Sequence, residues 1–116
     1  MPITFLADTN FHRDIVAGVL RRKPEIDFAV HESIIPDGMK DPEALALAAS
    51  LDRILVTHDV RTMPGHFGHF IERGRSPGLI LVPTRIPIGK VIEEILFIFQ
   101  VSEPEDWVNR FRRLPL

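Results

Sequence analysis

Short apolar runs alternate with amphipathic segments along the chain, and this alternation constrains the fold more than any other feature. Four runs have the length and apolarity of buried strands: residues 3–7, 26–30, 53–57 and 79–82. Segments with helical spacing lie between and after them: 11–23, 42–49, 64–73, 88–101 and one that opens at 104. The order βαβαβαβαα predicts an α/β three-layer sandwich with a central four-stranded parallel sheet. A loop is expected over 32–40, with His31 closing the second strand.

The composition fits one domain over residues 1–116 and excludes several classes of protein. The absence of Cys excludes disulfides, thiolate zinc sites, iron–sulfur clusters and a Cys nucleophile. The chain shows no signal-like N-terminus and no apolar run near the ~20 residues that span a bilayer. We therefore expect a cytoplasmic protein without membrane contact.

Polar residues at segment boundaries are expected to cap helices. Asn10 precedes the first helical segment, and Asp41 stands before Pro42, which suits a first helical position. Ser102 and Glu105 have the spacing of a capping box that opens a final helix.

Acidic residues follow the predicted strands. Asp8 comes directly after the first, Asp59 two residues after the third, and Asp41 and Glu43 begin the helix after the second. The carboxyl ends of parallel strands meet at one sheet edge, where ligands bind. Clustered carboxylates repel one another, and a hard cation such as Mg²⁺ or Mn²⁺ relieves that repulsion. Helix capping or turn formation is the alternative role for each acid.

Four motifs occur here in a characteristic order: L-A-D-T-N, D-P-E-A-L-A-L-A-A, I-L-V-T-H-D and P-G-L. Over about residues 3–84 the chain resembles the small PIN-like proteins of the PIN nuclease superfamily, many of which are toxins of toxin–antitoxin pairs. The resemblance implies a PIN-like fold and a Mg²⁺- or Mn²⁺-dependent ribonuclease with catalytic Asp8, Asp41 and Asp59. The same residues, with Glu43, would ligate the metal. RNA would be the substrate and an antitoxin protein a partner.

Two positions depart from the family pattern. Thr9 stands where relatives have Glu, and the run D-V-R-T-M puts Arg61 or Thr62 where relatives have a further Asp. These departures leave open one metal or two, and a catalytically degenerate PIN-like binding module. A receiver-like phospho-acceptor domain is a further alternative, because Thr84 follows the fourth strand. Against it, only one acid follows the first strand, and no fifth strand followed by Lys is predicted.

Polar and basic residues near the predicted site are candidates for substrate contact: Asn10, His12, His58, Arg61, His66 and Arg85. A zinc site built from His66 and His69 with His58 or Asp59 is a weaker alternative. Apolar Phe97, Ile98 and Val101 lie off the main stripe of their helix, which favours an interface with a second copy or an antitoxin.

The formal net charge of −2 does not argue against RNA. Without the three candidate aspartates the 16 acidic residues fall to 13, against 14 basic ones. A bound divalent cation adds two further positive charges, so we expect modest, locally directed binding to phosphates.

Overall fold

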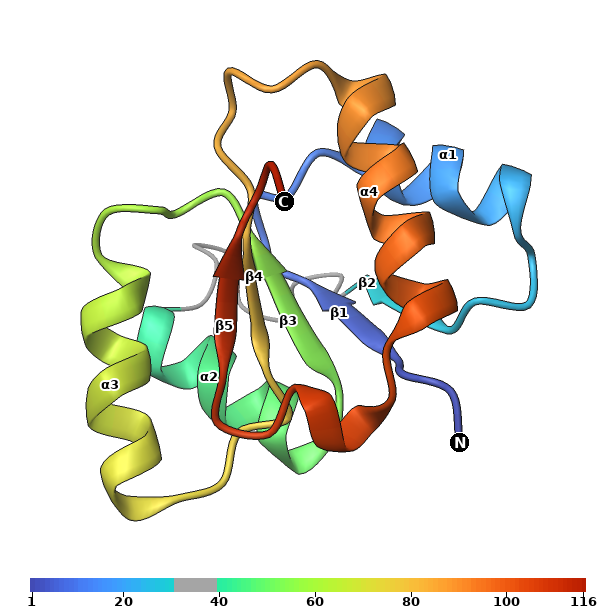
Figure 1. Ribbon diagram of the computed structural model, residues 1–116. Helices are drawn as coiled ribbons and strands as arrows, with labels where there is room; N and C mark the ends of the chain where they lie inside the picture. The colour runs from blue at the N-terminus through green and yellow to red at the C-terminus, as the bar shows by residue number, and fades with distance from the viewer. Residues whose placement is uncertain (31–39) are drawn as a thin grey trace.

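The computed structural model describes residues 1–30 and 40–116, and its centre is a five-stranded sheet (Figure 1). The strands are β1 (Phe5–Ala7), β2 (Phe28–Val30), β3 (Ile54–Thr57), β4 (Leu79–Leu81) and β5 (Phe111–Arg113). They are parallel and lie in the order β2-β1-β3-β4-β5. The α/β class and the parallel sheet are confirmed, whereas the predicted number of strands is wrong. The loop predicted over 32–40 and the role of His31 fall, apart from Lys40, outside the described residues.

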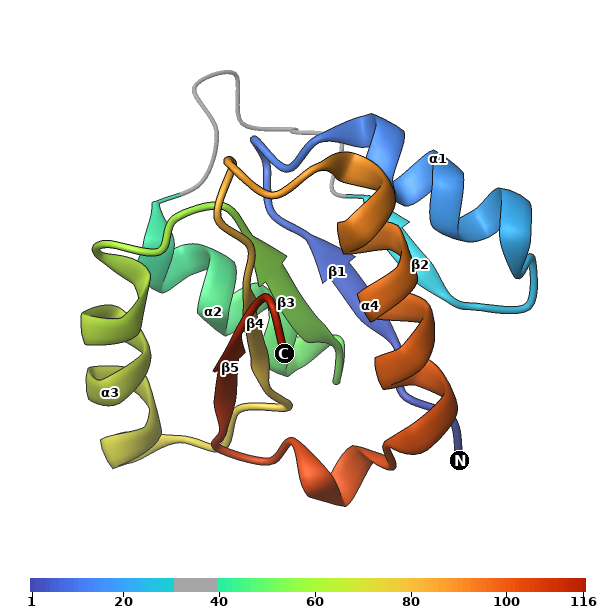
Figure 2. The same ribbon diagram turned by 45° about the horizontal axis from the view of Figure 1, so that its top comes forward.

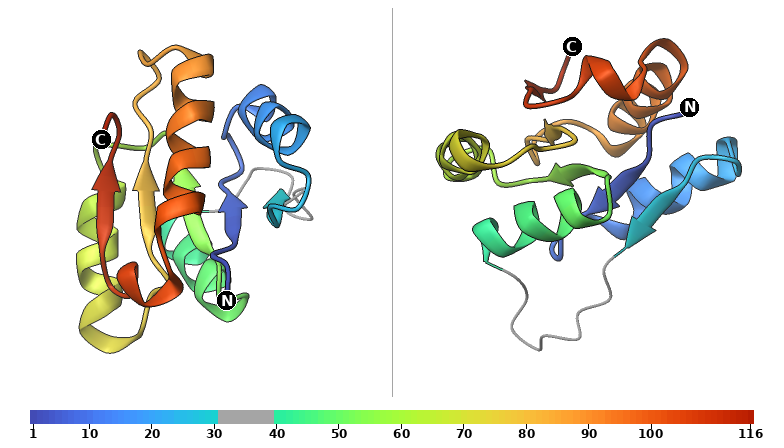
Figure 3. Two further views of the ribbon diagram at one scale, coloured as in Figure 1. Left: turned by 45° about the vertical axis from the view of Figure 1, so that its right-hand side comes forward. Right: turned by 90° about the horizontal axis from the view of Figure 1, so that it is seen from below.

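Two pairs of helices cover the two faces of the sheet, which makes three layers (Figures 2 and 3). One pair is α1 (Arg13–Arg22) and α4 (Ile88–Val101), which pack against each other. The other pair is α2 (Asp41–Ser50) and α3 (Met63–Arg73). The carboxyl ends of the central strands are left uncovered by this arrangement, as expected for a doubly wound sheet.

Side chains along the strands alternate between two apolar layers. Phe5 and Ala7 of β1 pack in the layer under α1 and α4, whereas Leu6 packs in the layer under α2 and α3. Val56 and Leu55 of β3 divide in the same way. Because both layers are apolar, the strands read in the sequence as continuous apolar runs rather than as alternating ones.

The last element differs from the prediction, because the expected helix is one 3₁₀ turn, Pro104–Asp106, followed by β5. A capping box does form, but Glu103 and Asp106 make it instead of Ser102 and Glu105. Asn109 then turns the chain with a left-handed backbone (φ 57°), and its side-chain oxygen accepts the N–H of Ser76 at 2.8 Å. This tie places the following residues beside β4, where they form the fifth strand.

Two predicted caps are also wrong. The helix α1 is capped by His12, whose Nδ1 accepts the N–H of Asp14 at 3.1 Å, and not by Asn10. Lys40 precedes α2, so Asp41 is its first helical residue instead of its cap. The carboxylate of Asp41 is therefore available for contacts outside its own helix.

The bounds predicted for α4 are confirmed, but one of its outward assignments is not. Ile98 is buried in the core beneath the helix, whereas Phe97 and Val101 are exposed.

None of the helices in the described part of the chain combines the length and the apolarity needed to cross a membrane.

The turn before β4 generates a prediction about stability. Gly78 has φ +130°, and a Cβ there would lie 2.8 Å from the Cβ of Trp107 and 3.0 Å from its carbonyl oxygen. We expect Gly78→Ala to lower the free energy of unfolding by about 2–4 kcal/mol, because backbone strain and a clash with backbone add. Denaturant unfolding followed by circular dichroism measures the loss.

The matched control is Gly68→Ala in α3, where a Cβ would meet open space. That change should raise stability by about 0.5–1 kcal/mol, because Ala is the better helix former. Equal stabilities of the two variants would contradict the account of the turn.

Candidate functional site

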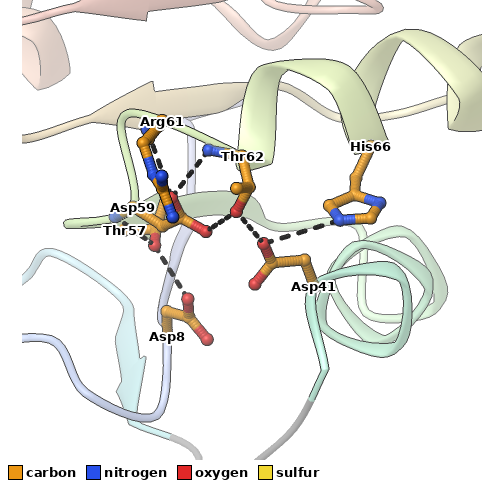
Figure 4. Close-up of polar contacts among 7 residues, drawn as sticks. All are labelled: Asp8, Asp41, Thr57, Asp59, Arg61, Thr62 and His66. Atoms are coloured by element: carbon orange, nitrogen blue, oxygen red, sulfur yellow. Dashed lines mark hydrogen bonds and ion pairs between the residues drawn. The ribbon is translucent and has the colours of Figure 1, made fainter.

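The three predicted aspartates meet at the carboxyl edge of the sheet (Figure 4). Asp8 follows β1, Asp59 lies in the β3–α3 connection, and Asp41 opens α2. Together they line a hollow of about 310 Å³, with Thr9, Asn10, Phe11, Thr57 and His58 as the other lining residues. Residues from distant parts of the chain therefore form one acidic site.

Asp8 is held by the two central strands. Its backbone N–H donates to the carbonyl of Val56 at 2.9 Å, which extends the pairing of β1 with β3 by one residue. Its Oδ1 accepts the N–H of Thr9, and its Oδ2 accepts the hydroxyl of Thr57, both at 2.8 Å. These contacts fix the carboxylate at the floor of the site.

Asp59 is stabilised as a carboxylate by several donors. Its Oδ1 accepts the backbone N–H groups of Arg61 at 3.2 Å and Thr62 at 2.9 Å, and its Oδ2 accepts the hydroxyl of Thr62. Partial burial by itself would raise the pKa of Asp59. The hydrogen bonds from Asp41, from the Thr62 hydroxyl and from the two N–H groups outweigh burial and hold that pKa below its usual range.

Asp41 has the opposite electrostatic environment. Its side chain is 21% exposed, and its Oδ2 lies 3.0 Å from the Thr62 hydroxyl and 3.9 Å from Nε2 of His66. Burial raises the pKa of Asp41, and so do its hydrogen bond to Asp59 and the charges of Asp59 and Asp8. Of the two acids, Asp41 is therefore the one whose ionisation its surroundings disfavour.

Two threonines that sequence reasoning did not assign connect these acids. Thr57 is buried, and its hydroxyl donates to Asp8 and accepts the N–H of Asp59 at 3.1 Å. Thr62 lies between Asp41 and Asp59. The position of Thr57 in the V-T-H-D motif is a signal that points to it. Thr62 stands out in the sequence only because it or Arg61 occupies the place of an acid in the family pattern.

His58 lines the hollow, but its ring is engaged within the protein. Nδ1 donates to the carbonyl of Val82 at 2.8 Å, and Nε2 accepts the backbone N–H of His12 at 3.1 Å. The ring also stacks on Phe11, with centroids 4.6 Å apart. Through these contacts His58 connects β3, β4 and α1. Its ring therefore has a structural role, whereas the sequence predicted that it contacts substrate.

The remaining predicted contact residues are distributed around the site. Arg61 and His66 stand beside the acids, and Asn10 is exposed on the wall of the hollow. The ring of His12 caps α1, and Arg85 is exposed in the β4–α4 connection. Glu43 is exposed in the first turn of α2 and, within the described residues, does not line the hollow.

The donor atoms suit a hard divalent cation, because three carboxylates and two hydroxyls meet without any thiol. In the described residues, however, no three His, Asp or Glu side chains are arranged around one point as ligands of an ion. The carboxylates are instead tied to the threonines and to backbone N–H groups. Binding of a cation would therefore require side-chain rotations within the acidic site.

Comparisons of this chain with protein-family models, with curated proteins and with solved structures found no match.

The raised pKa of Asp41 predicts how the site affects stability. When the pKa of a carboxyl group is higher in the folded state, the free energy of unfolding of the protein falls as the pH rises through that pKa. In Asp41→Asn the amide can still donate to Asp59 but carries no charge. We expect the midpoint temperature of this variant to exceed that of the native chain by about 3 °C near pH 7.5.

The advantage should shrink as the pH falls toward the ordinary carboxyl value, where the native Asp41 becomes protonated. Thermal unfolding in chelator-containing buffer from pH 4 to pH 8 measures both parts. An advantage of equal size at every pH would show that ionisation of Asp41 is not its cause.

Proposed function

We propose that this chain is a Mg²⁺- or Mn²⁺-dependent ribonuclease that hydrolyses phosphodiester bonds. The observation that carries the proposal is the convergence of Asp8, Asp41 and Asp59, from three separate elements, on one hollow at the carboxyl edge of the sheet. Burial, the hydrogen bond with Asp59 and the charges of Asp59 and Asp8 raise the pKa of Asp41, and perturbed carboxyl groups of this kind gather at functional sites. The ordered motifs shared with small PIN-like proteins support the same conclusion by analogy.

The protein's own residues have separable tasks in this proposal. Asp59 and Asp8 would offer their carboxylate oxygens as ligands of the cation. Asp59 is held as a carboxylate by its four donors, and Asp8 is held by Thr9 and Thr57. Asp41 would add a third carboxylate at the edge of the hollow. When bound, Mg²⁺ or Mn²⁺ supplies a water molecule of lowered pKa and a counter-charge for the phosphate. The exposed Arg61, and His66 beside Asp41, are placed to contact phosphates of the bound RNA.

A catalytically degenerate binding module is the second candidate. It is favoured by the arrangement of the side chains at the site, because no three acidic or histidine groups of the described residues surround one point as metal ligands. Thr9, and Arg61 or Thr62, stand where the family pattern has acids, so the site has fewer carboxylates than that pattern. This candidate expects the chain to bind RNA without cleaving it.

The structure adds one observation in favour of the receiver-like alternative, but two observations against it still hold. A fifth strand is present, which overturns one argument against it, and the order β2-β1-β3-β4-β5 is that of flavodoxin-like folds. However, Leu114 and Pro115 follow β5 where that alternative needs Lys, and Asp8 is the single acid directly after β1. We therefore rank phospho-acceptor function below nuclease function.

The nuclease proposal predicts metal-dependent cleavage of a mixed RNA pool. With Mn²⁺ the native chain should shorten the RNA, and a chelator should stop the reaction. Asp8→Asn and Asp59→Asn should each lower the rate by at least ~100-fold, because each removes a charged oxygen ligand. Gel analysis of end-labelled RNA measures the rates, and circular dichroism checks that the variants fold.

Asp52→Asn is the matched control, because Asp52 is an exposed aspartate away from the carboxyl edge with a backbone (φ 54°) that Asn also adopts. Its rate should equal the native rate. RNA binding without cleavage at any metal concentration would favour the binding module. Labelling of Asp59 by acetyl phosphate in a chain that does not cleave RNA would favour the receiver.

We further propose that the chain acts as the toxin of a toxin–antitoxin pair, with an antitoxin protein as partner. Expression of the native chain in a bacterial host should then arrest growth, and Asp8→Asn should relieve the arrest at equal protein level. Co-expression of a small protein encoded immediately upstream should restore growth. Equal growth with the native and Asp8→Asn chains would remove the toxin role but leave the nuclease chemistry standing.

A further inference from the structure

The strand β5 forms one edge of the sheet, with β4 on its inner side (Figure 1). The N–H of Leu79 in β4 donates to the carbonyl of Arg110 at 3.1 Å. Because backbone groups alternate in direction along a strand, those of Arg112 also face β4, whereas those of Phe111 and Arg113 face outward. Among the described residues, these outward groups have no hydrogen-bond partner. The outer edge of β5 therefore offers backbone donors and acceptors to a further strand.

One face of β5 is cationic. Arg110 and Arg112 are exposed and line a hollow of about 480 Å³, whose wall includes Trp107 from the apolar layer under α4. Neither arginine forms an ion pair with a described residue. Asp106 also lines this hollow, but its carboxylate accepts the N–H of Glu103 at 2.9 Å. Two guanidinium groups therefore lie beside the outer edge of β5 without an acidic partner in the described chain.

The other face of β5 carries Phe111. Its ring meets the buried ring of Phe67 in α3 edge-on, with centroids 5.7 Å apart, yet Phe111 is 46% exposed. Arg113 ends the strand on the same face and is also exposed. A strand added to this edge places its side chains on the same two faces as β5. A segment that fits therefore alternates acidic residues, opposite Arg112, with apolar residues, opposite Phe111.

A second copy of this chain does not have that pattern. If the β5 strands of two copies paired antiparallel through the outward groups of Phe111 and Arg113, the two Arg112 side chains would lie directly opposite each other. Like charges in that position are destabilising. Short, charged edge strands are one way in which proteins avoid pairing with their own copies. The same arginines attract an acidic strand, so their charge selects a partner other than this chain.

We propose that the outer edge of β5 is a docking site for an extended segment of a partner protein in which acidic residues alternate with apolar ones. The segment lengthens the five-stranded sheet by one strand. Main-chain hydrogen bonds to Phe111 and Arg113 supply affinity, and Arg110 and Arg112 select acidic side chains. The hollow beside β5 shares no lining residue with the acidic hollow in the described chain, so this inference does not rest on the ribonuclease proposal.

The first test measures, by fluorescence anisotropy, the binding of a labelled peptide in which Glu and Val alternate. The native chain should bind it with a dissociation constant below about 1 mM, and added salt should weaken the binding. Arg112→Glu should weaken it at least ~10-fold, because like charges then lie opposite each other. Arg22→Glu is the matched control, because it makes the same charge change at an exposed arginine in the last turn of α1, away from β5.

A reversal of charge adds a gain of binding to the expected loss. The variant with both Arg110→Glu and Arg112→Glu should bind a peptide in which Lys and Val alternate, and should no longer bind the Glu–Val peptide. The native chain should show the opposite preference, and thermal unfolding checks that the variant folds. Failure of the native chain to bind the Glu–Val peptide, or equal binding of both peptides, would overturn the proposal.

The second test distinguishes strand pairing from charge attraction alone. In an extended Glu–Val peptide, the N–H groups of the Glu residues and those of the Val residues point to opposite edges. Methylation of the N–H groups of one residue type should therefore weaken binding at least ~10-fold, and methylation of the other type should not. The Val groups face β5 if the peptide binds antiparallel, and the Glu groups face it if the peptide binds parallel. Equal effects of the two methylations would overturn strand addition.

Two other occupants give different results. Labelled RNA that binds through Arg110 and Arg112, while the Glu–Val peptide does not bind, would overturn the proposal and assign these arginines to nucleic acid. Self-association of the native chain that Arg112→Glu abolishes would assign the edge to a second copy and would also overturn it. Binding of the Glu–Val peptide by a chain that does not cleave RNA would support the docking site while the ribonuclease proposal fails.

Discussion

The parallel pairing of β1 with β3 is the constraint on which the candidate site depends. Ala7 stands opposite Val56, and the N–H of Asp8 continues the ladder to the carbonyl of Val56. This register brings the hydroxyl of Thr57 to Asp8 and places the β3–α3 connection directly above it. Both strands are central and buried, so their ends are among the least movable points of the fold. The floor of the site is therefore rigid, and adjustment falls to side chains above it.

The carboxylates of the site are stabilised by neutral hydrogen-bond donors. In the described residues no Lys or Arg forms an ion pair with Asp8, Asp41 or Asp59, and hydroxyl and backbone N–H groups bind them instead. Hydrogen bonds lower the pKa of Asp59, whereas burial, the hydrogen bond with Asp59 and the neighbouring charges raise the pKa of Asp41. Such a cluster costs folding stability, and proteins commonly keep that cost at functional sites.

Two residues near the site have roles opposite to those that their positions indicate. His58 stands inside a motif of acids, yet its ring joins three elements through two hydrogen bonds and a stack on Phe11. Thr62 stands at a helix start, where a structural cap is the ordinary interpretation, yet its side chain connects two acids. The difference arises because a side chain's partners are set by neighbouring elements and not by the local motif.

Sequence patterns were enough to predict the α/β class and the parallel pairing of strands that are apolar on both sides. They also predicted the bounds of α4 and the sheet edge where Asp8, Asp41 and Asp59 meet. Period, apolarity and chain order carry that information, because they are properties of each segment and of its connections. The three-dimensional structure was needed to find the fifth strand, since the hydrogen bond between Asn109 and Ser76 joins residues that are 33 positions apart. The three-dimensional structure was also needed to show that Glu43 does not line the described hollow and that Thr62 contacts Asp41. Such contacts between side chains depend on distances that no local sequence pattern specifies.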